Sequence, residues 1–129
     1  MECTLQQIRN FARKHRATIF NTMDGSRCLI AQYMESIGLK YPEYAGQGAY
    51  RHRSSEGLNA TFQSPPEYDA GICQGRLDSD SSPYFTGAQL EHYLTRLIKG
   101  NKSPKDCAKG MTGKTRDEYN AQFDGLPKA

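Results

Sequence analysis

Cys28 is the residue whose type and position best suit covalent chemistry, because it lies in the first turn of a helix predicted from Arg27 to Ile37. The free N–H groups and the dipole of a helix N-terminus stabilise a thiolate, the reactive form of cysteine. On a helical wheel Cys28 falls opposite the apolar face, beside Gln32 and Glu35. His52 is the histidine in the right order along the chain to serve as its base.

A cysteine that opens a helix ended by Gly38 resembles NlpC/P60 and other papain-like cysteine hydrolases. Those folds place the nucleophile at a helix N-terminus and a histidine later, on a strand. This sequence departs from the family at Leu29 and Ile30, where small residues are usual. The resemblance implies one alternative function, a cysteine hydrolase with Cys28 as nucleophile and His52 as base.

A second candidate site is the segment Tyr50-Arg51-His52-Arg53, at the end of a predicted loop that starts at Leu39. An aromatic side chain among cationic donors suits contact with phosphates and stacking on bases. The same residue types are enriched at the hot spots of protein interfaces. A nucleic acid and a protein therefore both remain alternatives as the partner of these four residues.

Charge is uneven along the chain, whose formal net charge is +3. Both ends are basic and the middle is mildly acidic, which points to weak nucleic-acid contact through the termini or to an acidic protein surface. Arg9, Arg13 and Arg16 follow one edge of the first predicted helix and form a second candidate contact surface. No dense run of Lys and Arg occurs, so a dedicated nucleic-acid domain is not favoured.

The sequence predicts no metal or cofactor. Its cysteines, Cys3, Cys28, Cys73 and Cys107, contain no CxxC pair, and Asp78 and Asp80 lack the glycine and the closing glutamate of a calcium loop. No apolar run is long enough to cross a membrane, and the basic N-terminal segment does not fit a signal peptide. We therefore expect a cytoplasmic protein with reduced thiols and no membrane contact.

Aliphatic residues are scarce, and eight tyrosines and five phenylalanines supply much of the apolar bulk. The apolar residues that exist concentrate on three amphipathic helices, predicted from Leu5 to about His15, from Arg27 to Ile37, and from Thr86 to Gly100. Short strands are predicted at Ala17–Asn21, Leu58–Phe62 and Ala70–Cys73. The chain is therefore expected to fold around a small core.

These elements predict an α+β fold, with three main helices packed on a small antiparallel sheet of two to four short strands. Residues 1–100 are expected to form a single compact domain. Residues 101–129 are expected to form a basic C-terminal extension, with a short helix after Ser103 and a helix or a mobile tail after Thr115.

The general character of the chain, short and rich in polar loops without a catalytic motif, resembles small accessory proteins of phages and mobile elements, including anti-CRISPR and other anti-defence inhibitors. Many of these inhibitors act stoichiometrically by covering a surface of a host complex. The resemblance implies a non-enzymatic inhibitor or modulator of a host protein or ribonucleoprotein complex, located in the host cytoplasm. The cysteine hydrolase and a nucleic-acid-binding accessory protein remain the alternatives.

Overall fold

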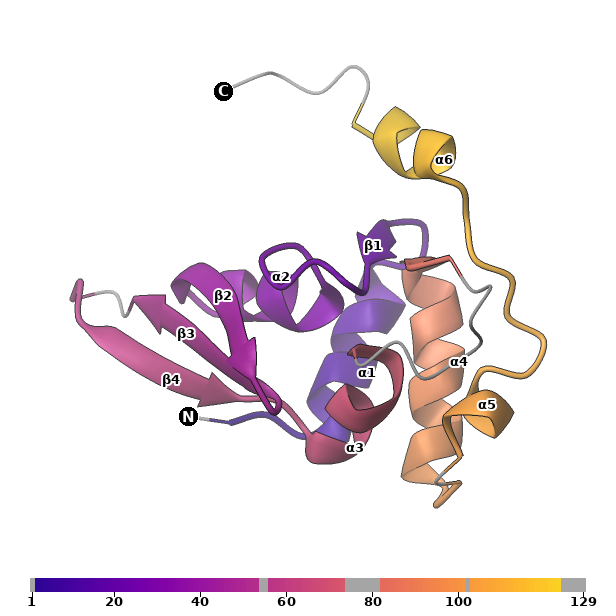
Figure 1. Ribbon diagram of the computed structural model, residues 1–129, viewed down its shortest axis with the longest axis horizontal. Helices are drawn as coiled ribbons and strands as arrows, with labels where there is room; N and C mark the ends of the chain where they lie inside the picture. The colour runs from indigo at the N-terminus through magenta and orange to yellow at the C-terminus, as the bar shows by residue number, and fades with distance from the viewer. Residues whose placement is uncertain (1, 54–55, 74–81, 102, 124–129) are drawn as a thin grey trace.

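The computed structural model describes residues 2–53, 56–73, 82–101 and 103–123, which form an α+β fold with two separate antiparallel sheets (Figure 1). The helices are α1 (Leu5–Lys14), α2 (Leu29–Ser36), α3 (Pro66–Tyr68), α4 (Gly87–Ile98), α5 (Pro104–Cys107) and α6 (Arg116–Ala121), and the π-helical turn η1 (Asp69–Cys73) follows α3. The strands are β1 (Ile19–Asn21), β2 (Lys40–Gly46), β3 (Ala49–Arg53), β4 (Asn59–Gln63) and β5 (Tyr84–Thr86). The predicted fold class is confirmed.

Helix starts follow from local sequence. The helices α1, α4 and α6 each begin with a reciprocal capping box, formed by the pairs Thr4 and Gln7, Thr86 and Gln89, and Thr115 and Glu118. In each box the threonine hydroxyl accepts from the third helical N–H, and the later side chain accepts from the threonine N–H. The predicted helix after Ser103 is also present, with Ser103 as its N-cap.

The helices α1 and α4 pack against each other over a core of fully buried residues that includes Ile8, Leu90 and Leu94. Gly87, the first residue of α4, lies against the end of α1. A Cβ atom on Gly87 would meet the backbone carbonyl oxygens of Ala12 and His15. Only a residue without a side chain allows the two backbones to approach this closely.

The two-stranded sheet pairs β1 with β5, with Phe20 opposite Phe85 in the core. The C-terminal segment reaches both outer edges of this sheet. At the β5 edge the Lys114 N–H donates to the Tyr84 carbonyl at 2.7 Å. At the β1 edge the Gln122 amide accepts from the Ile19 N–H and donates to the Ile19 carbonyl, both at 2.7 Å. Residues 103–123 are thus docked on the body of the fold.

The three-stranded sheet has the order β2-β3-β4, and its inner face packs on α2. The predicted loop from Leu39 to Arg53 is wrong, because these residues form the β2–β3 hairpin. The chain reverses through Gly46, Gln47 and Gly48, all at positive φ, which lets a segment rich in Gly, Tyr and Pro make a tight turn between strands.

Two further expectations need correction. Ala70–Cys73 is not a strand, because Pro66 opens a helical turn that continues as η1. The strand β5 was not expected, because it has only three residues and ends at Thr86, the predicted cap of the following helix. Asp78 and Asp80 lie outside the described residues. Among the described helices, none combines the length and the apolar character needed to span a bilayer.

Candidate interaction face

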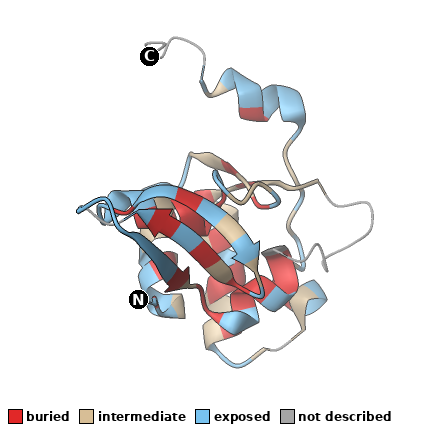
Figure 2. Cartoon of the chain, turned by 60° about the vertical axis from the view of Figure 1, so that its left-hand side comes forward, coloured by how far each residue is buried: buried red, intermediate tan, exposed pale blue. Residues whose placement is uncertain are grey.

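Strand alternation divides the predicted contact segment between the two faces of the sheet. Successive residues of β3 point to opposite faces, so Tyr50 and His52 are buried at 1% and 4% exposure, whereas Arg51 and Arg53 are exposed. Figure 2 shows buried and exposed residues alternating along the strands of this sheet. Tyr50 and His52 therefore offer almost no side-chain surface to a partner. The candidate surface is reduced to the two arginines of this segment.

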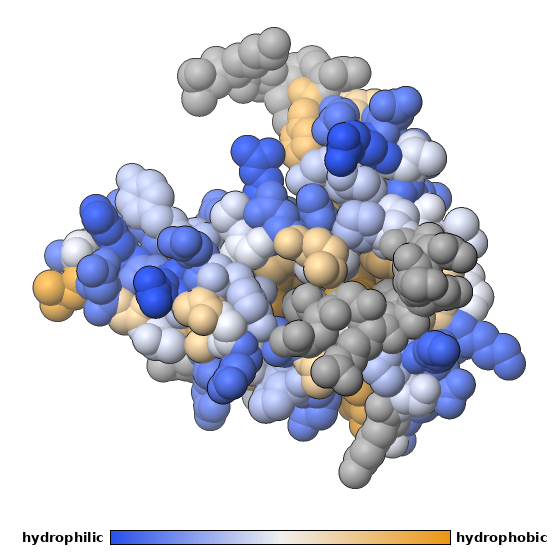
Figure 3. Space-filling view, in the orientation of Figure 1, coloured by the Kyte–Doolittle hydropathy of each residue, from blue (hydrophilic) through white to orange (hydrophobic). Residues whose placement is uncertain are grey.

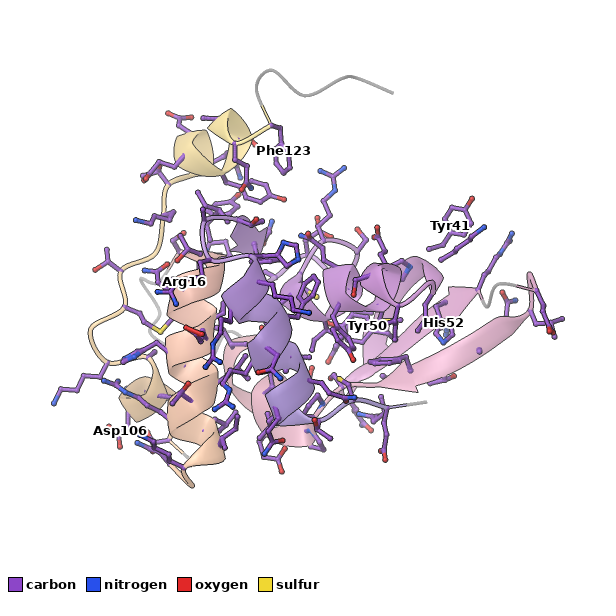
Figure 4. The ribbon with its side chains drawn as sticks, turned by 180° about the vertical axis from the view of Figure 1, so that it is seen from behind. Arg16, Tyr41, Tyr50, His52, Asp106 and Phe123 are labelled. Carbon is purple, nitrogen blue, oxygen red and sulfur yellow. The ribbon has the colours of Figure 1, made fainter. Side chains whose placement is uncertain are left out.

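Tyr41 is a surface residue that sequence reasoning did not single out. Its side chain is 75% exposed, and its backbone lies at φ 56°, an uncommon conformation for a bulky residue. The Arg53 guanidinium carbon lies 5.6 Å from the centre of the Tyr41 ring, within the range of a cation–π contact. In Figure 4 the Tyr41 ring points away from the body, whereas Tyr50 and His52 lie between the sheet and α2.

The outer face, the side of the three-stranded sheet turned away from α2, is hollowed over about 520 Å³. Its side chains come from all three strands: Tyr41, Glu43, Arg51, Arg53, Asn59 and Thr61. Two arginines outweigh one glutamate, so the face is positive. Among the described residues neither arginine has an ion pair, although Glu43 is the register partner of Arg51. Most of the side chains on this part of the molecule are hydrophilic in Figure 3, with apolar residues at its far left edge.

Cys28 is the N-cap of α2 and is 1% exposed, so its predicted position on the solvent side of the helix is wrong. A helical wheel cannot show that the hairpin covers this side of α2. The Cys28 sulfur lies 3.0 Å from the Tyr50 hydroxyl. Burial raises the pKa of the thiol, and this effect exceeds the lowering by the Tyr50 hydroxyl and the helix N–H groups. The environment therefore favours the neutral thiol over the predicted thiolate.

The Cys28–His52 pair of the hydrolase alternative is not assembled. Neither ring nitrogen of His52 has a hydrogen-bond partner among the described residues, and the imidazole packs edge-on against Phe62. A catalytic base has to reach its nucleophile by a hydrogen bond or through one water. The Cys28 sulfur is directed to Tyr50, and no direct hydrogen bond joins Cys28 to His52.

A buried polar network anchors the hairpin to the rest of the fold. The Tyr44 hydroxyl donates to an Asp69 carboxylate oxygen at 2.9 Å and accepts from the Gly48 N–H at 3.2 Å. The Ser64 hydroxyl donates to the Gly48 carbonyl at 2.8 Å. Buried polar groups with partners on several elements fix one arrangement of those elements. The network therefore sets the position of the sheet that carries the outer face.

The arginines predicted as a second contact surface on α1 are partly engaged inside the protein. Arg13 and Arg16 form ion pairs with Glu91 of α4, at 2.6 and 2.9 Å. Arg9 is half-buried, and its Nε has no hydrogen-bond partner in the described part of the chain. These ion pairs link α1 to α4, so two of the three arginines are already engaged within the protein.

The described residues contain no group of three or more His, Cys, Asp or Glu side chains arranged to hold a metal ion. Cys3, Cys28 and Cys107 are free and buried thiols. Comparison with protein-family models, with curated proteins and with solved structures finds no match to this chain. The case for function therefore rests on the geometry of the outer face.

Proposed function

We propose that the protein is a non-enzymatic binding protein that contacts a protein or ribonucleoprotein partner through the outer face of the β2–β3–β4 sheet. This is the stoichiometric mode of action of the small inhibitors that the sequence resembles, which cover a functional surface of a host complex. The observation that carries the proposal is Tyr41, a 75% exposed ring in cation–π contact with Arg53.

Tyrosine and arginine are the residue types that contribute most to the centres of protein interfaces. Tyr41 offers a rigid amphipathic ring, and its contact with Arg53 limits the motion that either side chain would lose on binding. Arg51 adds a second charged donor on the same face. A partner that brings acceptors to these donors would bury the ring and the two guanidinium groups together.

Site-directed photo-crosslinking tests the proposal. Tyr41→p-benzoylphenylalanine places a crosslinker in the outer face, and Met23→p-benzoylphenylalanine places one at a 56% exposed residue next to the two-stranded sheet. Extracts of the cells that make the protein are irradiated with each variant, and the adducts are identified by mass spectrometry. We expect a defined protein adduct from position 41 that is missing from position 23.

The charge dependence of the adduct is the second part of the test. Arg51→Gln with Arg53→Gln should abolish the adduct at position 41. Lys14→Gln with Lys105→Gln removes the same charge from exposed residues of α1 and α5 and should leave it unchanged. Equal adducts from positions 23 and 41 would contradict the proposal. So would an adduct at position 41 whose yield is unchanged by Arg51→Gln with Arg53→Gln.

A further inference from the structure

Arg51 and Arg53 are two residues apart on β3, and both belong to the outer face. Along a strand this separation is about 7 Å, which is also the spacing of alternate side chains in an extended peptide. On β4 their register partners are Thr61 and Asn59, whose side chains line the same hollow. On β2 the partner of Arg51 is Glu43 and the partner of Arg53 is Lys40. The two arginines thus form a short row with polar side chains on the β4 side, and on the β2 side a negative residue opposite Arg51 and a positive one opposite Arg53.

We infer that the occupant of the outer face is an extended acidic peptide segment whose carboxylates are two residues apart and meet Arg51 and Arg53. This inference rests on the proposed function and names its partner chemistry. A carboxylate accepts two parallel N–H bonds from a guanidinium, a geometry that lysine does not provide. An extended chain with acidic residues at alternate positions brings both carboxylates to the same side, where the two guanidinium groups lie.

The surroundings place the segment on the β4 side of the arginines. Glu43 repels a carboxylate on the β2 side of Arg51, whereas the Asn59 amide on β4, opposite Arg53, can donate to one. Tyr41 lies beside Arg53 and presents an exposed ring to the apolar part of a neighbouring side chain of the segment. The predicted ligand therefore combines two alternating acidic residues with an apolar neighbour at the Arg53 end.

A nucleic-acid strand fits this face less well. Its phosphates carry charge at every nucleotide, so a strand crossing the three-stranded sheet would bring phosphates to Glu43 as well as to the arginines. Only two cations line the hollow, which would neutralise about two phosphates and give weak binding at physiological salt. A peptide avoids the conflict because it can carry an uncharged residue opposite Glu43.

Fluorescence anisotropy with synthetic peptides tests the inference. The first peptide has the sequence Leu-Thr-Glu-Thr-Glu-Thr, and the second has the same composition with the two glutamates adjacent, which directs them to opposite sides of an extended chain. A fluorescein-labelled oligothymidine is the third probe. We expect the alternating peptide to bind about fivefold or more tightly than the adjacent one, as for the loss of one charge-assisted contact.

Variants of the full chain make the test specific. Arg51→Gln with Arg53→Gln should remove binding of the alternating peptide, and Lys14→Gln with Lys105→Gln should not. Glu43→Gln should tighten binding, because it removes the repulsion at the β2 border.

Equal affinity for the two peptides, no binding of either at millimolar concentration, or tighter binding of oligothymidine would overturn the inference. The proposed function stands if the crosslink at position 41 still depends on the arginines while the peptides fail to bind. Both fail if that crosslink is also missing.

Discussion

The two sheets of this small protein are completed in different ways. The β1–β5 sheet is closed by its own chain, since Gln122 bonds both backbone groups of Ile19 at one edge and Lys114 bonds Tyr84 at the other. The β2–β3–β4 sheet is covered by α2 on its inner face, while its outer face presents a hollow lined by charged and aromatic side chains. The β1–β5 sheet therefore serves to maintain the fold, whereas the outer face of the β2–β3–β4 sheet is accessible to a partner.

The scarce apolar residues suffice because both sheets contribute to one core. A single core contains Phe20 and Phe85 of the β1–β5 sheet and Tyr50 and Phe62 of the β2–β3–β4 sheet. Changes in that core or in the closure of the first sheet should cost stability. Changes on the outer face should cost binding and leave stability intact. Four predictions test this division, in order of the expected loss of stability.

Gly87→Ala should have the largest effect. The added methyl group would meet the backbone carbonyls of Ala12 and His15, which cannot move without separating α1 from α4. We expect a loss of about 3 kcal/mol in the free energy of unfolding, measured by urea denaturation. The control Gly57→Ala adds a methyl in open space at φ 82°, where backbone strain alone costs about 1 kcal/mol. Similar losses for the two variants would show that the α1–α4 contact is not rigid.

Gln122→Ala should remove the closure at the β1 edge. It leaves the Ile19 N–H and carbonyl without their partner, and we expect a loss of about 1–3 kcal/mol in the free energy of unfolding. Limited proteolysis should then cut between α5 and α6 faster than in the parent. Gln6→Ala, on the exposed side of α1, should change stability by less than about 0.5 kcal/mol. An equal effect of the two changes would mean that α6 does not support the sheet.

Alkaline pH should lower the free energy of unfolding through Cys3 and Cys28, two buried thiols near the β2–β3–β4 sheet. Burial raises the pKa of Cys3 to about 12 and raises the pKa of Cys28. An unfolded thiol ionises near pH 8.5, while the folded thiols keep their protons, so the unfolded state is favoured as pH rises. Stability from these thiols is complete below about pH 8.5 and should fall by about 1–2 kcal/mol for each thiol between pH 8 and 10.

The variant Cys3→Ala with Cys28→Ala isolates this contribution, because its free energy of unfolding should depend less steeply on pH over the same interval. Chemical denaturation at pH 7 and pH 10 measures both proteins. A parallel decline in the two would assign the alkaline loss to groups other than these thiols.

Arg51→Gln with Arg53→Gln should have the smallest effect on stability. Neither arginine has an ion pair among the described residues, and both are exposed, so the free energy of unfolding should stay within about 0.5 kcal/mol of the parent. Thermal denaturation followed by circular dichroism measures this. A loss of several degrees in melting temperature would assign the arginines to the fold and remove the basis for a binding face.

The helices could be predicted from the sequence because their signals are local. Thr4 with Gln7 and Thr86 with Gln89 specify where α1 and α4 begin, and Gly38, at φ 92°, ends α2 as expected. The hairpin was missed because its strands carry Gly, Pro and Tyr in the pattern of a loop. Its pairing depends on β4 and α2, which lie elsewhere in the sequence.

The same non-local contacts limited prediction of the site. Arg51 and Arg53 were identified by residue type, but only the strand shows that Tyr50 and His52 point to the other face. Cys28 was expected on the solvent side because a wheel for one helix omits the sheet that covers it. Tyr41 gave no signal, since its exposure comes from a left-handed backbone at the start of β2.

Chemical-shift mapping with the alternating acidic peptide tests the central division most directly. In a titration of the isotope-labelled protein, we predict shift changes at the amides of Tyr41, Arg51, Arg53, Asn59 and Thr61. The amides of the β1–β5 sheet and of Gln122 should not change. Changes centred on β1 and β5, or spread evenly over both sheets, would contradict the assignment of the outer face as the binding surface.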